Sequence, residues 1–192
     1  MITALANHIA DFIYSNTELS EEQREIYVYG YEIIISSAIS FILLIATGLI
    51  FGRLPESIVF FLVFYILRQK TGGYHADTYL KCNFIFEINI ILVMMLTLID
   101  FPFAVLIAVN IAACMLCLVT ILILAPVENE NKPIAPELRP KHKIAALILT
   151  FIFEAASICL LNHIKFSICI SMAMASTAVA MLINIKKKEK KV

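Results

Sequence analysis

The stretch "FPFAVLIAVNIAACMLCLVTILIL", residues 101–124, contains no charged side chain. About 20 consecutive apolar residues are enough for an α-helix to cross the hydrocarbon core of a bilayer. Its apolar residues are continuous and do not alternate with polar ones, which predicts a helix and not a strand of a membrane barrel. This stretch therefore sets the expected fold class, an all-α polytopic membrane helical bundle.

The composition of the whole chain agrees with that class. Of 192 residues, 61% are hydrophobic and only 16% are charged, whereas a soluble domain has about 45–50% apolar and 25% charged residues. Six apolar blocks are separated by polar or proline-bearing breaks. They cover residues 32–51, 54–67, 84–99, 101–124, 144–161 and 164–185. We therefore expect about six transmembrane segments in a single integral membrane domain, residues 1–192.

The first 30 residues have a different pattern. Apolar side chains recur there at helical spacing, at Ile2, Leu5, Ile9, Phe12 and Ile13. Such a stripe beside polar residues predicts an amphipathic helix that lies in the membrane interface. Ser20 followed by Gln23 is a capping-box pattern, so a second helix is expected to begin there.

The basic residues give an orientation. Lys and Arg concentrate in the cytoplasmic loops of membrane proteins, and a cytoplasmic amino terminus puts 13 of the 15 inside. These are Arg24, Arg68, Lys70, Lys81, Lys132, Arg139, Lys141, Lys143 and the five lysines of 186–191. Both termini, segment 68–83 and connector 125–143 are therefore predicted to be cytoplasmic. The terminal "KKKEKK" is expected to contact lipid headgroups, and no nucleic-acid partner is expected.

Five cysteines are present. Cys114, Cys117, Cys159 and Cys169 lie inside apolar blocks, where a free cysteine usually behaves as a small hydrophobe. Cys114 and Cys117 form a C-x-x-C pair, but no second pair of ligands accompanies it, so zinc is not favoured. We expect neither a metal nor another cofactor. Cys82 alone lies in a polar segment.

That segment, "RQKTGGYHADTYLKCNF" (68–84), brings His75 within seven residues of Cys82. A histidine can take the proton of a cysteine thiol, whose ordinary pKa is near 8.5. On one continuous helix the two residues would lie about 10.5 Å apart along the axis, which is too far for proton transfer. A catalytic pair therefore requires a bend, which Gly72-Gly73 permits. On these residues alone, a simple loop between spans and a catalytic pair both remain open.

A wider set of residues resembles a known family. The set comprises Arg68, Gly72, Gly73, His75, Ala76 and Cys82, together with Ala125-Pro126 and Lys132-Pro133. It is similar to the accessory gene regulator B (AgrB) family, multi-span membrane cysteine peptidases of bacteria, and the resemblance extends over essentially the whole chain. It implies a multi-pass protein of the bacterial cell membrane that processes an AgrD-type pro-peptide into a cyclic quorum-sensing signal. It also implies a homodimer.

The resemblance assigns roles to single residues. Cys82 matches the nucleophile and His75 the general base, while Arg68, Gly72 and Gly73 match other motif positions. The implied reaction is cleavage of the peptide's C-terminal tail through a thioester, followed by closure of a thiolactone or lactone ring. Asp77, Glu87 and Glu154 are candidates for a third, orienting residue, although none of them matches a family position. Pro126, Lys132 and Pro133 are candidates for a substrate groove, with a rigid connector as the simpler alternative.

Two other functions fit parts of the sequence. A small transporter or exporter of peptides would use polar groups inside its spans, such as Glu154 and Asn110, and its activity would survive alkylation of Cys82. A non-catalytic scaffold would show no preference for labelling at Cys82 over the other cysteines.

Overall fold

The computed structural model describes residues 2–16, 20–73, 76, 78–128 and 134–189. Within these residues the chain forms helices and no β-strand, so the predicted all-α class is confirmed. The helices are α1 (Ile2–Asn16), α2 (Glu21–Ile50), α3 (Leu54–Thr71), α4 (Tyr79–Leu96), α5 (Phe103–Leu124), the short 3₁₀ turn η1 (Pro136–Leu138), α6 (Arg139–Cys159) and α7 (Ile164–Glu189).

Each of the six predicted apolar blocks coincides with a helix. In five of these places, at α2, α4, α5, η1 with α6, and α7, the helical segment is long and apolar enough to cross a membrane. The sixth, α3, has 18 residues, and its last turn carries Arg68 and Lys70. The chain is therefore a multi-pass membrane bundle, and among the six expected spans α3 is the one that is not apolar enough over its length to be counted with the other five.

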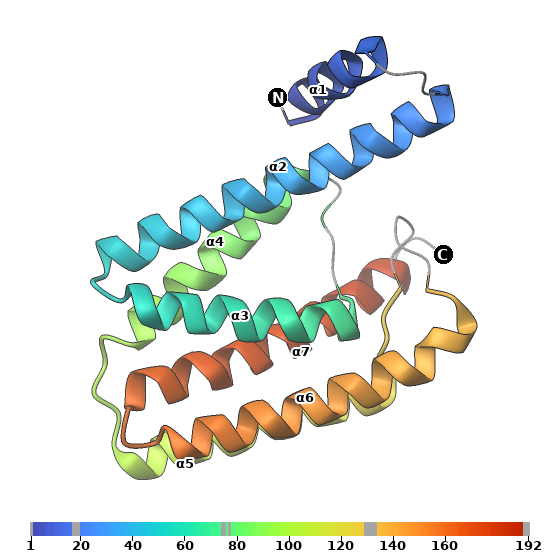
Figure 1. The fold of residues 1–192 in the computed structure, drawn as a ribbon. Coiled ribbons are helices and arrows are strands. Elements are labelled where there is room, and N and C mark those ends of the chain that lie inside the picture. Colours follow the sequence, from blue (N-terminus) through green and yellow to red (C-terminus); the bar gives the residue numbers. More distant parts are fainter. Residues whose placement is uncertain (1, 17–19, 74–75, 77, 129–133, 190–192) are drawn as a thin grey trace.

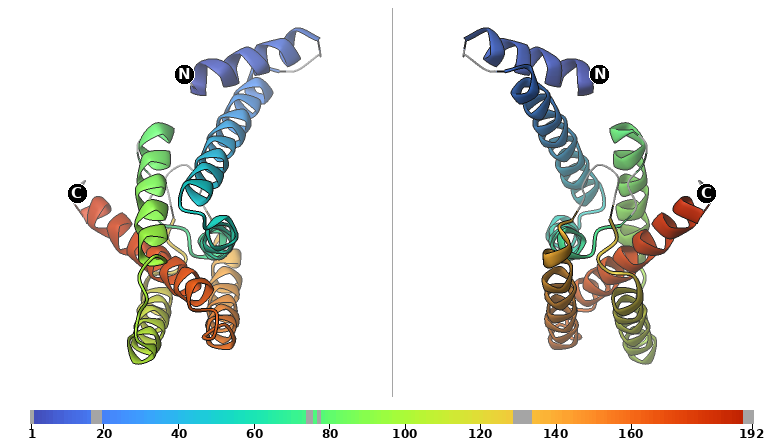
Figure 2. Two further views of the ribbon diagram at one scale, coloured as in Figure 1. Left: turned by 90° about the vertical axis from the view of Figure 1, so that its left-hand side faces the viewer. Right: turned by 90° about the vertical axis from the view of Figure 1, so that its right-hand side faces the viewer.

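The bundle is built around α3 (Figure 1). Helix α2 packs on one side of it, and α7 and α6 pack on the other. Helix α5 packs against α6 and α7, while α4 packs mainly against α2 and also meets α3 and α7. The side views in Figure 2 show α1 set apart from the other helices at the start of α2.

Successive helices run in alternating directions, so their connections gather at two ends (Figure 1). The turns at residues 51–53, 97–102 and 160–163 lie at one end. The end of α3, the connector that follows α5, and the end of α7 lie at the other. The ends of α3, α5 and α7, from which the segments assigned to the cytoplasm by the charge pattern continue, are thus at one end of the bundle.

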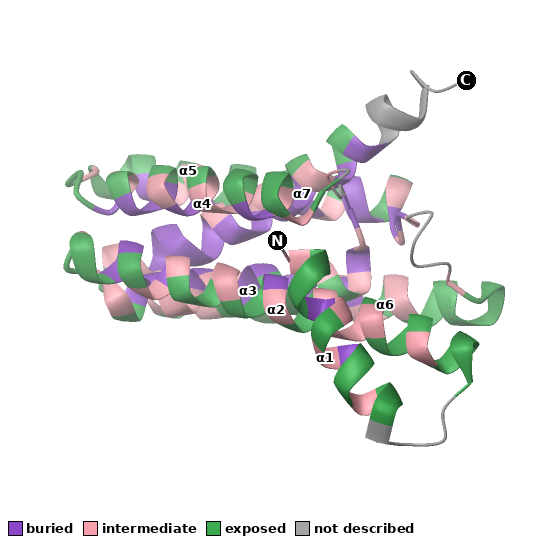
Figure 3. Cartoon of the chain, turned by 90° about the horizontal axis from the view of Figure 1, so that it is seen from above, coloured by how far each residue is buried: buried purple, intermediate pink, exposed green. Residues whose placement is uncertain are grey.

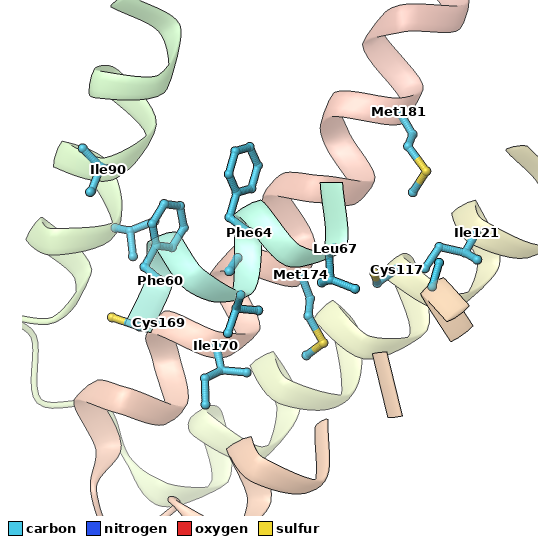
Figure 4. Packing of buried hydrophobic residues seen from close by; sticks show 14 of the residues in the cluster. Phe60, Phe64, Leu67, Ile90, Cys117, Ile121, Cys169, Ile170, Met174 and Met181 are labelled. Carbon is cyan, nitrogen blue, oxygen red and sulfur yellow. The ribbon is translucent and has the colours of Figure 1, made fainter. Parts of the chain in front are cut away.

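The core lies where α3, α5 and α7 face one another (Figure 4). Phe60 and Leu67 of α3 are fully buried, as are Met174 and Met181 of α7 and Ile121 of α5. Seen from above, buried residues line the inside of the helix layers and exposed ones the outside (Figure 3). Most of the exposed residues on the spans are large and apolar, as lipid-facing surfaces are.

A buried polar cluster links α5, α6 and α7. Asn110 of α5 accepts hydrogen bonds from the hydroxyls of Ser157, Ser167 and Ser171. It also donates from its amide to Ser167 and to the backbone carbonyl of Leu106. Asn110 thus hydrogen-bonds across helices, and such bonds are a main specific force between helices in lipid.

The start of the chain has the predicted helical form. Ser20 and Gln23 make both hydrogen bonds of a capping box at the start of α2. Helix α1 packs against α2 through small buried residues such as Ala6 and Ala10, and Arg24 holds it there by donating from Nε to Asp11 at 2.8 Å. The apolar residues Leu5 and Phe12 remain exposed, and they are available to a membrane interface.

Candidate active site

The polar segment begins with a sharp turn at the end of α3. Gly72 and Gly73 both have positive φ, 70° and 134°, in the region that side chains other than glycine rarely adopt. Helix α3 ends at Thr71 and α4 begins at Tyr79. The predicted bend at the glycine pair is therefore confirmed, and no single helix runs from position 72 to Cys82.

The turn is tied to the connector that follows α5. The backbone N–H of Val127 donates to the carbonyl oxygen of Thr71 at 2.8 Å, and Gly72 pairs with Val127 in an isolated bridge. A Cβ atom at Gly72 would lie 2.0 Å from the carbonyl oxygen of Val127. Glycine is thus required at position 72 both for its φ and for the space it leaves.

Gly73 and the connector also contact the end of α7. Gly73 is buried, and a Cβ atom there would touch Ala180 of α7 at 3.4 Å. The side chain of Asn184, one turn further along α7, donates to the backbone carbonyl of Glu128 at 3.4 Å. Residues 125–128, which include the cis-peptide Ala125-Pro126, therefore form one wall beside the glycine turn.

Cys82 is presented by the first turns of α4. Thr78 caps this helix by accepting a hydrogen bond from the N–H of Lys81, and the N–H of Cys82 donates to the carbonyl of Thr78 at 3.1 Å. The thiol is free and half-buried. Capping by Thr78 fixes where the helix begins, and so it fixes the position of Cys82 in the helix.

Arg68 lies near Cys82 from the neighbouring helix. Its guanidinium carbon is 5.5 Å from the centroid of the Phe64 ring, one turn earlier on α3. Burial lowers the pKa of the Arg68 guanidinium from its ordinary value, and its interaction with Cys82 raises it. The end of α3 therefore brings a guanidinium group near Cys82.

The direction of Cys82 follows from its helical neighbours. Phe86 lies one turn further along α4, on nearly the same face as Cys82. Its ring packs against those of Phe61 and Phe64 of α3, with centroid distances of 6.1 and 6.0 Å. Cys82 therefore lies on the side of α4 that faces α3, the helix that carries Arg68 and ends in the glycine turn.

Four predicted site residues fall outside the residues that the structure describes: His75, Asp77, Lys132 and Pro133. Their roles stay predictions. The end of α3 and the end of α5, from which the two segments that hold these residues continue, lie at the same end of the bundle.

Glu154 lies away from this segment. It is on α6, which packs against α5, α3 and α7, and its carboxyl group lies near the thiol of Cys114 on α5. One carboxyl oxygen of Glu154 is buried without a hydrogen-bond partner. The structure thus puts Cys82 near Arg68 and joins Gly72 and Gly73, at the end of the helix that carries Arg68, to Val127 and Ala180, with Glu154 on a different pair of helices.

The sequence reading overlooked several residues that hold this site. They are the helix cap Thr78, the turn's partner Val127, and Asn83, whose side chain is bound by two serines of α2. One signal was present: Tyr79, Asn83 and Glu87 form a polar stripe at i, i+4, i+8 in a helix whose other residues, apart from Lys81, Cys82 and Asn89, are apolar. Nothing in the sequence pointed to Val127, because its pairing joins segments more than 50 residues apart.

Comparison with known proteins decides the family. A family model described as accessory gene regulator B matches residues 6–183 of this chain. The chain belongs to the AgrB family. The resemblance first seen in the motif at 68–82 is therefore confirmed over nearly the whole length. Membership associates the chain with processing of the accessory gene regulator autoinducer, with an AgrD-type pro-peptide as the substrate that the family implies.

Two relatives come from Clostridium perfringens. An AgrB-like protein of strain SM101 is 27% identical over 176 residues, which cover 88% of this chain and 82% of the relative. A second AgrB-like protein, from strain 13, is 27% identical over 159 residues, covering 74% of this chain and 68% of the relative. No solved structure matches the chain.

Proposed function

We propose that this AgrB family member is a membrane cysteine peptidase that cleaves the C-terminal tail of a short pro-peptide and promotes its cyclisation. The observation that carries the proposal is the position of Cys82. Its half-buried thiol lies in the first turns of α4, beside the Arg68 charge and just after the Gly72-Gly73 turn. The four other cysteines lie in the apolar helices α5, α6 and α7.

The reaction proceeds by acyl transfer. His75 takes the proton of the Cys82 thiol, and the thiolate attacks the carbonyl carbon of the bond before the tail. The C–N bond breaks, the leaving amine receives the proton from His75, and a thioester between the peptide and Cys82 remains. A cysteine or serine side chain of the peptide then attacks the thioester carbonyl. The ring closes as a thiolactone or lactone, and the Cys82 thiol is restored.

Ring closure depends on positioning. Exchange of one thioester for another changes bonding energy little, so the gain comes from holding the attacking side chain close and excluding water. A site formed by the end of α3, the start of α4 and residues 125–128 suits this role. It is set at the end of an apolar bundle, and its turn is fixed by backbone contacts.

The charges nearby suit a pro-peptide with an acidic tail. Arg68, Lys70 and Lys81 flank the turn, and a positive site draws negative peptide groups toward it. In this proposal the site faces the cytoplasm, where the pro-peptide is made. Whether the molecule works as a homodimer is a separate expectation, which follows from the family resemblance.

Co-expression with a short neighbouring reading frame tests the proposal. The frame should encode an amphipathic start, a central cysteine or serine, and an acidic tail. We expect the wild-type protein to remove the tail and reduce the peptide mass further by the water lost on ring closure, as measured by mass spectrometry. Cys82→Ala, Cys82→Ser and His75→Ala should insert in the membrane normally and leave the peptide intact.

The matched control is Cys159→Ala. Cys159 is a second accessible thiol, exposed at the end of α6, and its loss should leave processing unchanged. Tail removal by the Cys82→Ala variant would show that the nucleophile is elsewhere, and the proposed chemistry would be wrong.

A further inference from the structure

We propose that Asn83 is a positioning residue for the Cys82 thiol, which it aims by fixing the rotation of α4 about its own axis. The inference rests on the proposed function, because it takes Cys82 as the reacting group. It assigns a role to a contact between α2 and α4 that the motif at 68–82 does not include.

The contact is a line of polar pairs between two apolar helices. Asn83 accepts hydrogen bonds at its Oδ1 from the hydroxyls of Ser36 and Ser40 of α2, both at 3.0 Å. Its amide nitrogen lies 3.4 Å from the backbone carbonyl of Ser36, to which it donates. Asn83 is 4% exposed, so its amide is removed from solvent and lipid alike.

Two further pairs extend the line along the same helices. Tyr79 lies near Glu32 of α2, and the hydroxyl of Thr47 donates to the carboxylate of Glu87. Tyr79, Asn83 and Glu87 are spaced i, i+4, i+8 and therefore form one face of α4. We call these three α4 residues and their α2 partners Glu32, Ser36, Ser40 and Thr47 the polar seam.

The polar seam matters because much of the remaining surface of α4 is apolar and exposed, as at Leu80, Phe84, Ile85 and Ile88. In a membrane, lipid chains are as apolar as these residues, so burying one apolar face rather than another gains little. The seam acts together with two other contacts of α4: Phe86 packs on α3, and Asn89 accepts a hydrogen bond from Ser176 of α7 at 3.1 Å. The hydrogen bonds of the seam are lost if α4 turns, and they therefore help to select one rotation.

Cys82 immediately precedes Asn83, and successive residues of an α-helix differ by about 100° around the axis. With Asn83 against α2, Cys82 lies toward α3, on the side of Phe86. A turn of one residue in one direction would put Cys82 against α2. In the other direction it would put Cys82 on the lipid-facing side. Asn83 is the seam residue nearest to Cys82 and the one with hydrogen bonds to two side chains.

The test uses a variant in which the other four cysteines are replaced by alanine, so that Cys82 is the only thiol. In this background, Asn83→Ala is compared with the parent for kcat and KM on the purified pro-peptide, and for the rate at which a maleimide alkylates Cys82. We expect kcat to fall by up to about 100-fold, as for a misplacement of a reacting group by about 1 Å. KM should stay nearly constant, and the alkylation rate should change.

A matched pair of variants on α2 tests the same contact from its other side. Ser36→Ala with Ser40→Ala removes both hydroxyl donors and should reproduce the loss in kcat. Ser37→Ala, an exposed residue between them, should not. Combining Asn83→Ala with the serine pair should cost no more than the larger single effect, because the changes remove one shared interaction.

Three results would overturn the inference. One is an Asn83→Ala protein with the parent's kcat and alkylation rate. Another is a loss of activity that is fully accounted for by a loss of folded protein, as measured by thermal unfolding in detergent. The third is full additivity with the serine pair. Failure of the proposed function is distinguishable, because Cys82→Ala would then still process the pro-peptide, whatever Asn83 does.

Discussion

Gly72 carries two constraints at once, and they can be separated experimentally. Its φ is positive, and a Cβ atom would lie 2.0 Å from a backbone oxygen that cannot move away as a flexible side chain could. We expect Gly72→Ala to destabilise the protein by about 1–3 kcal/mol from backbone strain alone, with a further cost from the collision. The turn before Cys82 would be displaced, so processing should be lost. Thermal unfolding in detergent and the peptide assay measure the two effects.

Gly52 and Gly30 are the controls. Gly52 also has a positive φ, 62°, but nothing lies within 4 Å of the place a Cβ atom would occupy, and Gly30 has open space inside a helix. Gly52→Ala should therefore show the strain without the collision and should keep processing activity. Gly30→Ala should be neutral or slightly stabilising, since alanine favours helix by about 1 kcal/mol. Equal behaviour of all three variants would contradict the account of Gly72.

At the scale of helices, the spans are held by few but specific polar contacts. Asn110 joins three helices through the serines of α6 and α7. Hydrogen bonds of this kind contribute about 0.6 kcal/mol each on average in a membrane. Asn110→Ala should therefore lower the free energy of unfolding by about 1–2 kcal/mol, since several bonds are lost together. Unfolding in mixed micelles measures this change.

Thr120→Ala is the control for that prediction. Thr120 is also buried on α5, but its hydroxyl bonds to carbonyls of its own helix, those of Leu116 and Cys117. Its removal should cost less than the loss of Asn110. A larger cost at Thr120 would mean that the interhelical cluster is not what holds these helices.

The positions of the helices along the chain were predictable from the sequence, but which helices pack against each other was not. Continuous apolar blocks indicated where each spanning helix lies, because length and apolarity alone decide what spans a bilayer. The start of α2 lies well before its block, 32–51, and was indicated instead by the capping box at Ser20 and Gln23. Which faces meet could not be predicted in the same way, since an apolar face fits lipid as well as it fits another helix. The polar stripe on α4 is the exception, because it can be recognised in the sequence and it packs against α2.

For the molecule as a whole, the predicted orientation in the membrane puts Cys159 and Cys82 on opposite sides, so the two thiols should differ in their accessibility from outside the cell. Cys159 is exposed at the end that the charge pattern assigns to the outside, while Cys82 lies at the opposite end. A membrane-impermeant maleimide added to intact cells should label Cys159 and leave Cys82 unreacted until the membrane is permeabilised. Mass spectrometry of each single-cysteine variant measures the labelling. Labelling of Cys82 in intact cells would reverse the predicted orientation.

The bond between Thr71 and Val127 also bears on the order of biosynthesis. A ribosome makes Cys82 well before it makes Val127, and Ala180, which Gly73 contacts, later still. A nascent chain therefore exposes its reactive thiol before the turn in front of it has acquired its partners. The turn closes only after α5 has been inserted, and its contact with α7 forms only after nearly the whole chain has been translated. Incomplete chains that carry Cys82 thus lack the finished turn, which confines the proposed activity to the completed protein.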